Sequence, residues 1–503
     1  MIATRFRLLL VSLLVVWGQG CVTDTGPNPS PQLCNGMGAQ LSPSEVSDIV
    51  LKAAASLDSA TMTVAVVDRS GNILAIFRKP GADSSNDNLA VSLARTGAFF
   101  SNNQAPLSSR TVRSISGIHF PAGVPLTANA ALYGIENTNR GCELNVTFNE
   151  GKAIPPSKSV SGGDCNSTDR SGCGLGITTG KLDLKDSDPN AVNPGGIPIF
   201  RGCTVVGGIG VAGVPREHSE FAALSGTAGF PPSIAAPAVV FVEGISLPFV
   251  KQTTQPVGTT IGSVAGSFIV GPIAGLAAPD GYLVGPNAGS SLTKDEVKII
   301  VEQSIETANR TRAAIRLPIG LRTRMVISVS DLDGTILALF RMTDSTVFSI
   351  DVAVAKSRNV VYFSGSDPDV ALDLLEVPIK TAVTNRTISF GGQPLYPPGI
   401  DGSGFGPFMG LFLRDSKTAC SQGSQSPNLN QNGIVFFPGS TPLYKNGVLS
   451  GGLGVSGDGV EQDDYVTAGG AAGFAPADSI RADQLFLRDI RLPFFKFPRN
   501  PEA

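Results

Sequence analysis

The 503-residue sequence is poor in histidine and in charge: it has two histidines, 16% of its residues are charged, and its net charge is −3. None of its seven cysteines forms a CxxC pair, so a common ligand spacing of metal sites is missing. The few, scattered charges give no electrostatic basis for binding nucleic acid or an anionic membrane surface. These absences argue against a metal site built from the cysteines and against a nucleic-acid-binding protein.

The sequence also lacks the main motifs of hydrolases and nucleotide-binding enzymes, namely GxSxG, the P-loop and HExxH. GIGVAG and GLGVSG match part of a dinucleotide-binding fingerprint, but each lies inside a predicted strand and no βαβ unit surrounds it. We therefore assign no catalytic residue, and the sequence does not favour an enzyme.

The N-terminus has the layout of an export signal. The apolar run Leu8–Trp17 is shorter than the roughly 20 residues of a membrane span, two arginines precede it, and Cys21 follows it. This arrangement resembles a bacterial lipoprotein signal. We predict a signal peptide over residues 1–20, lipidation of Cys21, and a flexible tether over residues 21–40. The protein would then be held at the bacterial cell envelope. Export with simple cleavage and a retained anchor are the alternatives.

Export would place the remaining cysteines in an oxidising compartment, where disulfides are expected. Cys165 and Cys173 lie in one Gly/Ser/Asp-rich loop and are the favoured pair. A pairing of Cys142 with Cys203 is left open.

What the sequence does contain is a repeat. Residues 195–230 predict two strands, the second interrupted by glycines, followed by a helix of small residues. The same pattern returns over residues 439–474 at a constant offset of 244. The chain is therefore interpreted as a tandem duplication.

Further segments recur in the same order, among them a helix with a capping box and a hairpin with an Asp-x-x-Gly turn. They predict one domain over residues 41–255 and a second over residues 292–499. The Gly/Pro/Ala-rich stretch 256–291 is expected to be a linker that packs against both domains. The paired segments are 41–57 with 292–308, 63–79 with 326–342, 88–101 with 349–364, 113–123 with 386–399, and 241–251 with 486–496.

Each copy predicts the order helix, hairpin, helix, hairpin, helix. Consecutive hairpins favour an antiparallel sheet, and amphipathic helices must cover its faces. The expected fold class is α+β, with two tandem layered domains. Two copies in one chain would pack most simply as an internal pseudo-dimer.

These segments resemble the GlcG/HbpS family, which also includes the C-terminal domain of PduO-type proteins. The resemblance rests on residues 64–78, 94–101, 195–199, 207–213 and 223–229, and on their partners in the second copy. It implies a profilin-like layered fold with an antiparallel sheet of about five strands, and a tendency to form homo-oligomers. It also implies haem binding, sometimes with haem degradation or with sensing through a partner in the membrane.

A haem site needs an axial ligand, an apolar slot and cations for the propionates. His119 and His218 both lie in the first copy, so imidazole ligation is possible there alone. His218 stands beside carboxylates at the start of the helix that follows the glycine-rich strand. The alternative for each histidine is a polar residue without a ligand.

Gly207, Gly208 and Gly210 remove side chains from an otherwise β-branched strand. The missing side chains create a slot either for a flat ring or for the close approach of a helix. The helix expected in the second case is the small-residue one around residues 222–228. Both interpretations stay open at this point.

Arginines recur at matched positions of the two copies, which points to retained ion pairs or to contacts with an anionic ligand. Arg78 and Arg95 are the candidates to reach the anionic edge of a ligand. The matched pairs are Arg78 with Arg341, Arg95 with Arg358, and Arg113 with Arg386.

The sequence therefore favours an exported, membrane-tethered binding protein for haem or a related flat, anionic small molecule. A structural or protein-interaction module without a ligand is the second hypothesis, and a haem-degrading enzyme is the third.

Overall fold

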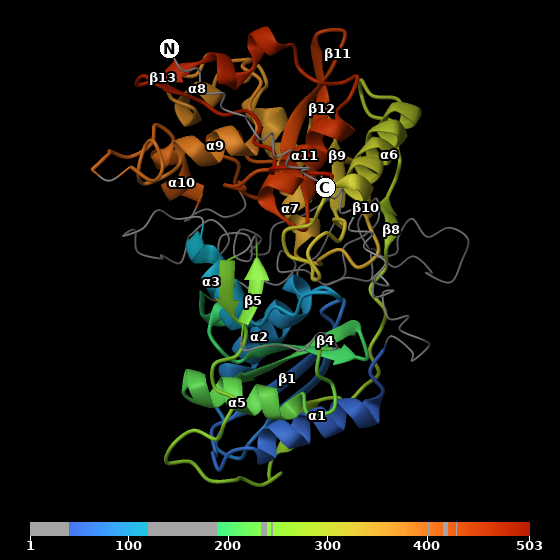
Figure 1. Cartoon of the computed structure of the whole chain (residues 1–503), viewed down its shortest axis with the longest axis vertical. Coiled ribbons are helices and arrows are strands. Elements are labelled where there is room, and N and C mark those ends of the chain that lie inside the picture. The colour runs from blue at the N-terminus through green and yellow to red at the C-terminus, as the bar shows by residue number, and fades with distance from the viewer. Residues whose placement is uncertain are drawn as a thin grey trace, which may run out of the picture. The chain divides into compact units, whose positions relative to one another are not determined.

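The structure is a computed structural model that describes residues 40–118, 189–232, 239–242, 245–400, 402–415, 421–428 and 430–503. It contains two five-stranded antiparallel sheets with the same succession of strands (Figure 1). The first sheet has the order β3 (Gly196–Arg201), β4 (Thr204–Ala212), β1 (Thr63–Asp68), β2 (Ile73–Arg78), β7 (Ser267–Val270). The second has the order β11 (Ser440–Lys445), β12 (Val448–Ser456), β9 (Val326–Ser330), β10 (Ile336–Arg341), β8 (Gly281–Val284). We call residues 40–270 the first half and residues 279–503 the second half.

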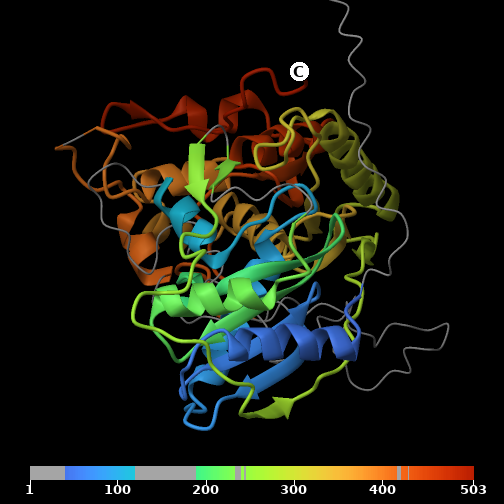
Figure 2. The ribbon, with the colours of Figure 1, turned by 60° about the horizontal axis from the view of Figure 1, so that its bottom comes forward.

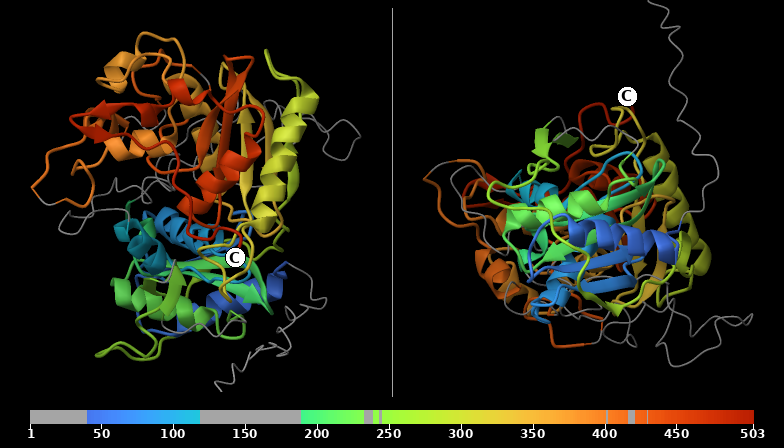
Figure 3. Two further views of the ribbon diagram at one scale, coloured as in Figure 1. Left: turned by 45° about the horizontal axis from the view of Figure 1, so that its top comes forward. Right: turned by 90° about the horizontal axis from the view of Figure 1, so that it is seen from below.

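Helices cover both faces of each sheet, as the α+β prediction requires. In the first half, α1 (Pro43–Ala55) and α5 (Arg216–Gly226) lie side by side on one face (Figure 2), and α2 (Asn86–Phe100) covers the other. In the second half, α6 (Lys294–Arg310) and α11 (Val460–Gly470) form the corresponding pair (Figure 3), and α7 (Ser349–Phe363) corresponds to α2.

The predicted capping boxes are confirmed at the start of both α1 and α6. The Ser42 hydroxyl accepts the backbone N–H of Glu45, and the Glu45 carboxylate accepts the Ser42 N–H at 2.8 Å. Thr293 and Glu296 make the same reciprocal pair. Each box satisfies backbone donors that a helix start otherwise leaves unpaired, which fixes where the two helices begin.

The stretch 256–291 is more than the linker that its composition suggested, because it supplies one strand to each sheet. Ser267–Val270 pairs with the outer side of β2, and Gly281–Val284 pairs with the outer side of β10. The β-branched and aromatic residues of these two short runs suit edge strands. Both sheets thus reach five strands only with this segment.

Shorter elements complete the two halves. They include two separate two-stranded sheets, one in each half, at the matched segments 241–251 and 486–496, for which no hairpin was predicted. The remaining elements are α3 (Ser109–Ile118), η3 (Pro189–Val192), β5 (Val239–Val242), β6 (Ile245–Pro248), α8 (Val370–Asp373), α9 (Asn385–Gly391), α10 (Met409–Asp415), η4 (Asp478–Ile480), η5 (Ala482–Gln484), β13 (Phe486–Leu487) and β14 (Ile490–Arg491).

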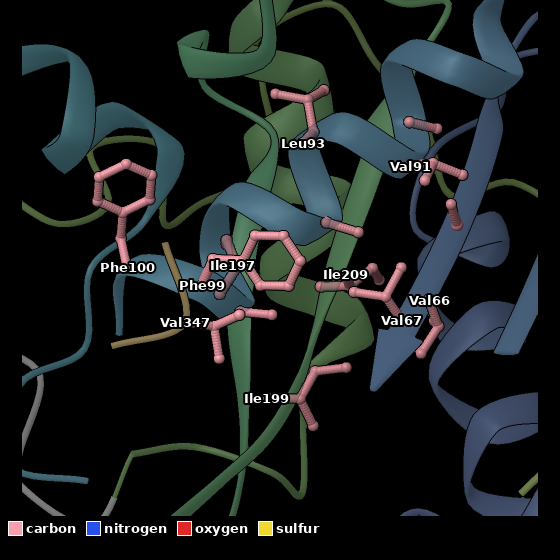
Figure 4. Packing of buried hydrophobic residues seen from close by; sticks show 14 of the residues in the cluster. Val66, Val67, Val91, Leu93, Phe99, Phe100, Ile197, Ile199, Ile209 and Val347 are labelled. Atoms are coloured by element: carbon pink, nitrogen blue, oxygen red, sulfur yellow. The ribbon is translucent and has the colours of Figure 1, made fainter. Parts of the chain in front are cut away.

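The two halves share one hydrophobic cluster, in which the C-terminal end of α2 contacts the segment before α7. The Val347 N–H donates to the Phe99 carbonyl at 3.0 Å, and Figure 4 shows Val347 beside Phe99. The rings of Phe100 and Phe348 stack with their centroids 4.2 Å apart. Burying these aromatic surfaces stabilises the contact between the halves.

Candidate functional site

The glycines of β4 admit helix α2 rather than a ring. A Cβ placed on Gly208 or on Gly210 would lie less than 3.0 Å from the carbonyl oxygen of Ala94 or of Ala90, both in α2. Gly207 faces the opposite way, toward the backbone of Val67 in β1. The space that the missing side chains leave is therefore filled by backbone, and the ring slot expected there is wrong.

The same packing occurs in the second half. A Cβ on Gly452 or Gly454 of β12 would collide with the carbonyl oxygen of Ser357 or of Ala353 in α7. The helix-packing alternative thus describes the structure, although the helix is α2 and not the small-residue helix α5 that the sequence suggested. Glycine is required here because the helix backbone approaches the strand directly.

The sequence-predicted ligands do not converge. His218 lies in the first turn of α5, half-buried, and does not line the pocket described below. Cys203 is disulfide-bonded, and its partner lies outside the described residues. Four predicted site residues lie outside the described residues, namely His119, Cys21, Cys165 and Cys173.

Arg78 and Arg95 are engaged in internal contacts. Arg78 holds the Asp87 carboxylate through both arms of its guanidinium, with Nε at 2.8 Å from Oδ1, and this bond raises the pKa of Arg78. Arg95 is buried and its Nε donates to the Gly71 carbonyl at 2.9 Å. Its counterpart Arg358 donates in the same way to Gly334. In both halves this arginine therefore stabilises the turn between the two strands of the first hairpin.

The third matched pair needs a correction, because the structural counterpart of Arg386 is Arg110 and not Arg113. Arg110 in α3 binds Glu220 of α5 with Nε at 2.7 Å from Oε1. Arg386 in α9 binds Asp464 of α11 through its own Nε. Arg113 instead donates to the amide oxygen of Asn193. The two ion pairs occupy equivalent places, so this arginine links the same helices in both halves.

A pocket of about 570 Å³ lies against the loop that connects α6 to β9. Its volume is in the range of small-molecule sites. Four arginines and two aspartates line it, which gives its wall a net positive charge. The lining residues are Asn103, Gln104, Asp280, Gly281, Ile305, Asn309, Arg316, Leu321, Arg322, Arg324, Phe340, Arg341, Met342, Thr343 and Asp344.

Arg316 is the fixed centre of this wall. It is 3% exposed, and it binds Asp458 through Nε and Asp344 through Nη1 at 2.6 Å. The Asp344 carboxylate also accepts the backbone N–H of Asn103 from the first half at 3.1 Å. These charge-assisted contacts raise the pKa of Arg316 despite its burial. Arg316 therefore stays charged, and Asp344 connects it to the first half at the pocket.

The other three arginines differ in how firmly they are held. Arg341 is buried and bonds only to carbonyl oxygens, those of Ser345 and Pro279, and burial lowers its pKa to about 10. Arg324 and Arg322 are half-buried. Arg324 donates to the Asn309 side-chain oxygen, and Arg322 donates to the backbone carbonyls of Glu502 and Ala503. These two guanidinium groups are the ones free to turn toward an anion, because their present bonds are weak, exposed ones.

The apolar part of the wall consists of Ile305, Leu321, Phe340 and Met342. A flat anionic ring fits this combination of apolar surface and cations. For an iron atom, the lining residues offer no imidazole, thiol or phenol, and the thioether of Met342 is the one sulfur among them. That sulfur accepts the Met325 N–H at 3.3 Å, a weak bond. The lining thus offers the cations and apolar surface that haem requires, and Met342 is the lining residue whose sulfur would hold the iron.

Sequence reasoning missed this pocket because it compared the two copies. The loop 311–325 carries Arg312, Arg316, Arg322 and Arg324, whereas the equivalent connection in the first half, residues 56–62, is shorter and has no arginine. A segment without a counterpart was not weighed. The four arginines in a loop that only one copy has were the sequence signal that could have indicated the pocket.

The described ranges contain neither a cluster of metal ligands nor a helix that could span a membrane. No cluster of three or more His, Cys, Asp or Glu side chains there suits a metal ion. No helix in those ranges has both the length and the hydropathy to cross a bilayer.

Comparison with known families gives a match within the second half. Residues 293–472 match the model of the family described as haem degrading protein HbpS-like. Over this segment the chain forms an HbpS-like domain, as the resemblance in the sequence indicated, and no second match to the model covers the first half. Comparison with curated proteins gives no match.

Solved structures of this kind also match. A PduOC:heme complex is 23% identical over 37% of this chain and 95% of that chain, with a TM-score of 0.24. Protein ORFY of Klebsiella pneumoniae is 19% identical over 37% and 91%, with a TM-score of 0.24. A double mutant of Streptomyces reticuli HbpS is 15% identical over 37% and 88%, with a TM-score of 0.22.

Proposed function

We propose that this protein binds haem, or a related flat anionic small molecule, in the arginine-lined pocket. The observation that carries the proposal is an overlap: the segment that matches the HbpS-like family, residues 293–472, supplies most of the pocket wall. A family match alone is weak evidence for function, since function depends on the site. Here the matched segment supplies most of the pocket wall, and the first half and the segment of strand β8 supply the rest.

The chemistry of the wall supports the same ligand class. Arg322 and Arg324 hold no buried acid and are available to the carboxylates of a ring, while Phe340 and Leu321 offer it apolar contact. A bound haem supplies an iron centre with a strong Soret absorption. The residues of this chain orient the ring, shield one side of it and neutralise its carboxylates.

The proposal is tested by titrating haemin into the full chain and following the Soret band. We expect saturable binding that weakens at least tenfold when Arg322→Glu and Arg324→Glu are combined, because two attractive charges become repulsive. Met342→Leu is expected to shift the position of the band. The matched control is His218→Ala, which lies outside the pocket and is expected to leave affinity and spectrum unchanged. Loss of binding in the control, with binding kept in the double variant, would relocate the site.

A second candidate is a haem-degrading enzyme, which the description of the matched family favours. A Soret band that forms and then decays in the presence of a reductant and oxygen would support it, and a stable band supports binding. A chain that never develops a Soret band would leave the protein-interaction role as the better account.

We also propose that the protein is exported and lipid-anchored, with Cys21 acylated after removal of residues 1–20. The support is the sequence of the N-terminus: arginines, an apolar run and then cysteine. Mass spectrometry of protein from cells is expected to find an N-terminal peptide that begins at acylated Cys21. An intact Met1 in that protein would exclude this processing. An internal pseudo-dimer, homo-oligomers and a membrane-protein partner remain proposals of the same kind.

A further inference from the structure

One buried cation of the first half has an unused hydrogen-bond donor. Arg69 follows β1, is 6% exposed, and donates from Nη2 to the Ser101 carbonyl at 2.6 Å. Its Nη1 is buried and has no hydrogen-bond partner. Leaving a charged donor buried and unpaired costs several times what a surface contact contributes, so such groups are rare unless a ligand pairs with them.

Arg69 lies close to the pocket, although it is not among the residues that line it. The charged groups that act on it are Arg341, Asp344 and Arg316, all of which line the pocket. Burial, together with the two like charges, lowers the pKa of Arg69 to about 9. The acids at this place are Asp344, together with Asp458 on Arg316 and Asp280 near Arg341.

Neighbouring polar groups are unpaired as well. The side-chain N–H groups of Asn102 lack a partner, and Asn102 directly follows the residue that holds Arg69. The Ser345 hydroxyl, next to Asp344 in the chain, is also buried without a partner. An anion would satisfy several of these donors at once, as buried donors in proteins normally require.

We propose that Arg69 and Asn102 form a carboxylate subsite, at which the first half binds an acidic group of the ligand that occupies the pocket. The inference rests on the proposed function and names the group of the ligand that is recognised. An arginine fork matches a carboxylate with two parallel bonds, and the nearby amide of Asn102 adds a third donor. The ligand site is then incomplete without the first half, although the family match covers only the second.

The test compares haemin with its dimethyl ester, whose carboxylates are blocked, by Soret titration of the full chain. Wild type is expected to bind haemin about tenfold or more tightly than the ester, the size expected for charge-assisted hydrogen bonds. Arg69→Gln is expected to lose part of this preference, and the part that remains is that of Arg322 and Arg324. Arg113→Gln is the matched control, since Arg113 lies in the same half, is not among the residues that line the pocket and donates to Asn193. It is expected to keep the preference.

Three outcomes overturn the inference. Equal affinity of wild type for both forms removes the carboxylate subsite but leaves the proposed function standing. A preference that stays as large in Arg69→Gln as in wild type assigns all carboxylate recognition to Arg322 and Arg324. Absence of a Soret band with either form removes the proposed function and the subsite together. If Arg69→Gln does not fold, Arg69→Lys replaces it: a lysine keeps the charge but cannot form the fork, so a preference as large as that of wild type would contradict the subsite.

Discussion

The two halves repeat one strand order, yet they differ where chemistry is expected. The connection between the first helix and the first strand is the short, arginine-free segment 56–62 in the first half and the longer, arginine-rich segment 311–325 in the second. The sheets, the glycine-to-helix contacts and the Arg110 and Arg386 ion pairs are shared. Shared features therefore build the fold, and the unshared loop builds the pocket.

A second difference lies in the core. In the second half, the Lys356 ammonium is fully buried and binds the Asp463 carboxylate at 2.9 Å. Leu93 and Ser219 occupy the equivalent positions in the first half, beside Gly195, which corresponds to Gly439. An ion pair and an apolar–polar pair thus fill the same place, so the fold does not require the charges. Substitutions of Lys356 and Asp463 can therefore test whether the second half needs its ion pair.

The largest effect is expected for Lys356→Leu alone. It leaves Asp463 buried without its cation, and the free energy of unfolding should fall by about 3–5 kcal/mol. Combining it with Asp463→Ser, which copies the first half, should restore most of the loss. Urea unfolding of wild type, both single variants and the double variant measures this coupling. If the two single losses simply add in the double variant, the pair does not act as a unit.

Next in size are the glycines that face the helices. Gly210→Val should lower the free energy of unfolding by about 3 kcal/mol, since the new side chain meets the Ala90 carbonyl of α2. Gly454→Val should cost a similar amount, because Ala353 stands in the same place. Gly404→Val is the control, since nothing lies near its Cβ. Equal melting temperatures for all three variants would show that α2 and α7 do not sit on these strands.

A smaller effect is expected at the shared ion pairs. Glu220→Gln and Asp464→Asn each remove the charge that an arginine and two backbone N–H groups contact. Each substitution should lower the free energy of unfolding by about 1–3 kcal/mol. The loss should be similar in the two halves. Thermal unfolding compares them. If only one of the two variants loses stability, the two ion pairs have the same geometry but do not contribute equally to the free energy of unfolding.

The smallest effect concerns pH. Burial raises the pKa of Asp463 to about 7, although Lys356 opposes the shift. Since the folded state then binds a proton more tightly than the unfolded state, this group stabilises the fold most at low pH, and its contribution falls as the pH rises from about 4 to about 7. The difference in stability between wild type and the Lys356→Leu/Asp463→Ser variant should change with that slope. A difference that is flat over this range would contradict the raised pKa.

The predictable part of this molecule is the part governed by local rules. The capping boxes at Ser42 and Thr293 follow from spacing alone, and so do the hairpins. The purpose of Gly208 and Gly210 did not follow, because a ring and a helix need the same missing side chains. What fills the space beside these glycines is decided by tertiary packing, which the sequence of one strand does not reveal. The pocket was hidden for a related reason, since its loop has no counterpart to compare with.

The measurement that tests the account most directly is the number of haemin molecules bound per chain at saturation. The end point of a Soret titration at protein concentrations well above the dissociation constant gives this number. The account predicts one, because the arginine-rich loop 311–325 exists once and the first half contributes contacts to that same pocket through Asn103 and Gln104. Two equivalent molecules per chain, one for each half, or none at all, would contradict it.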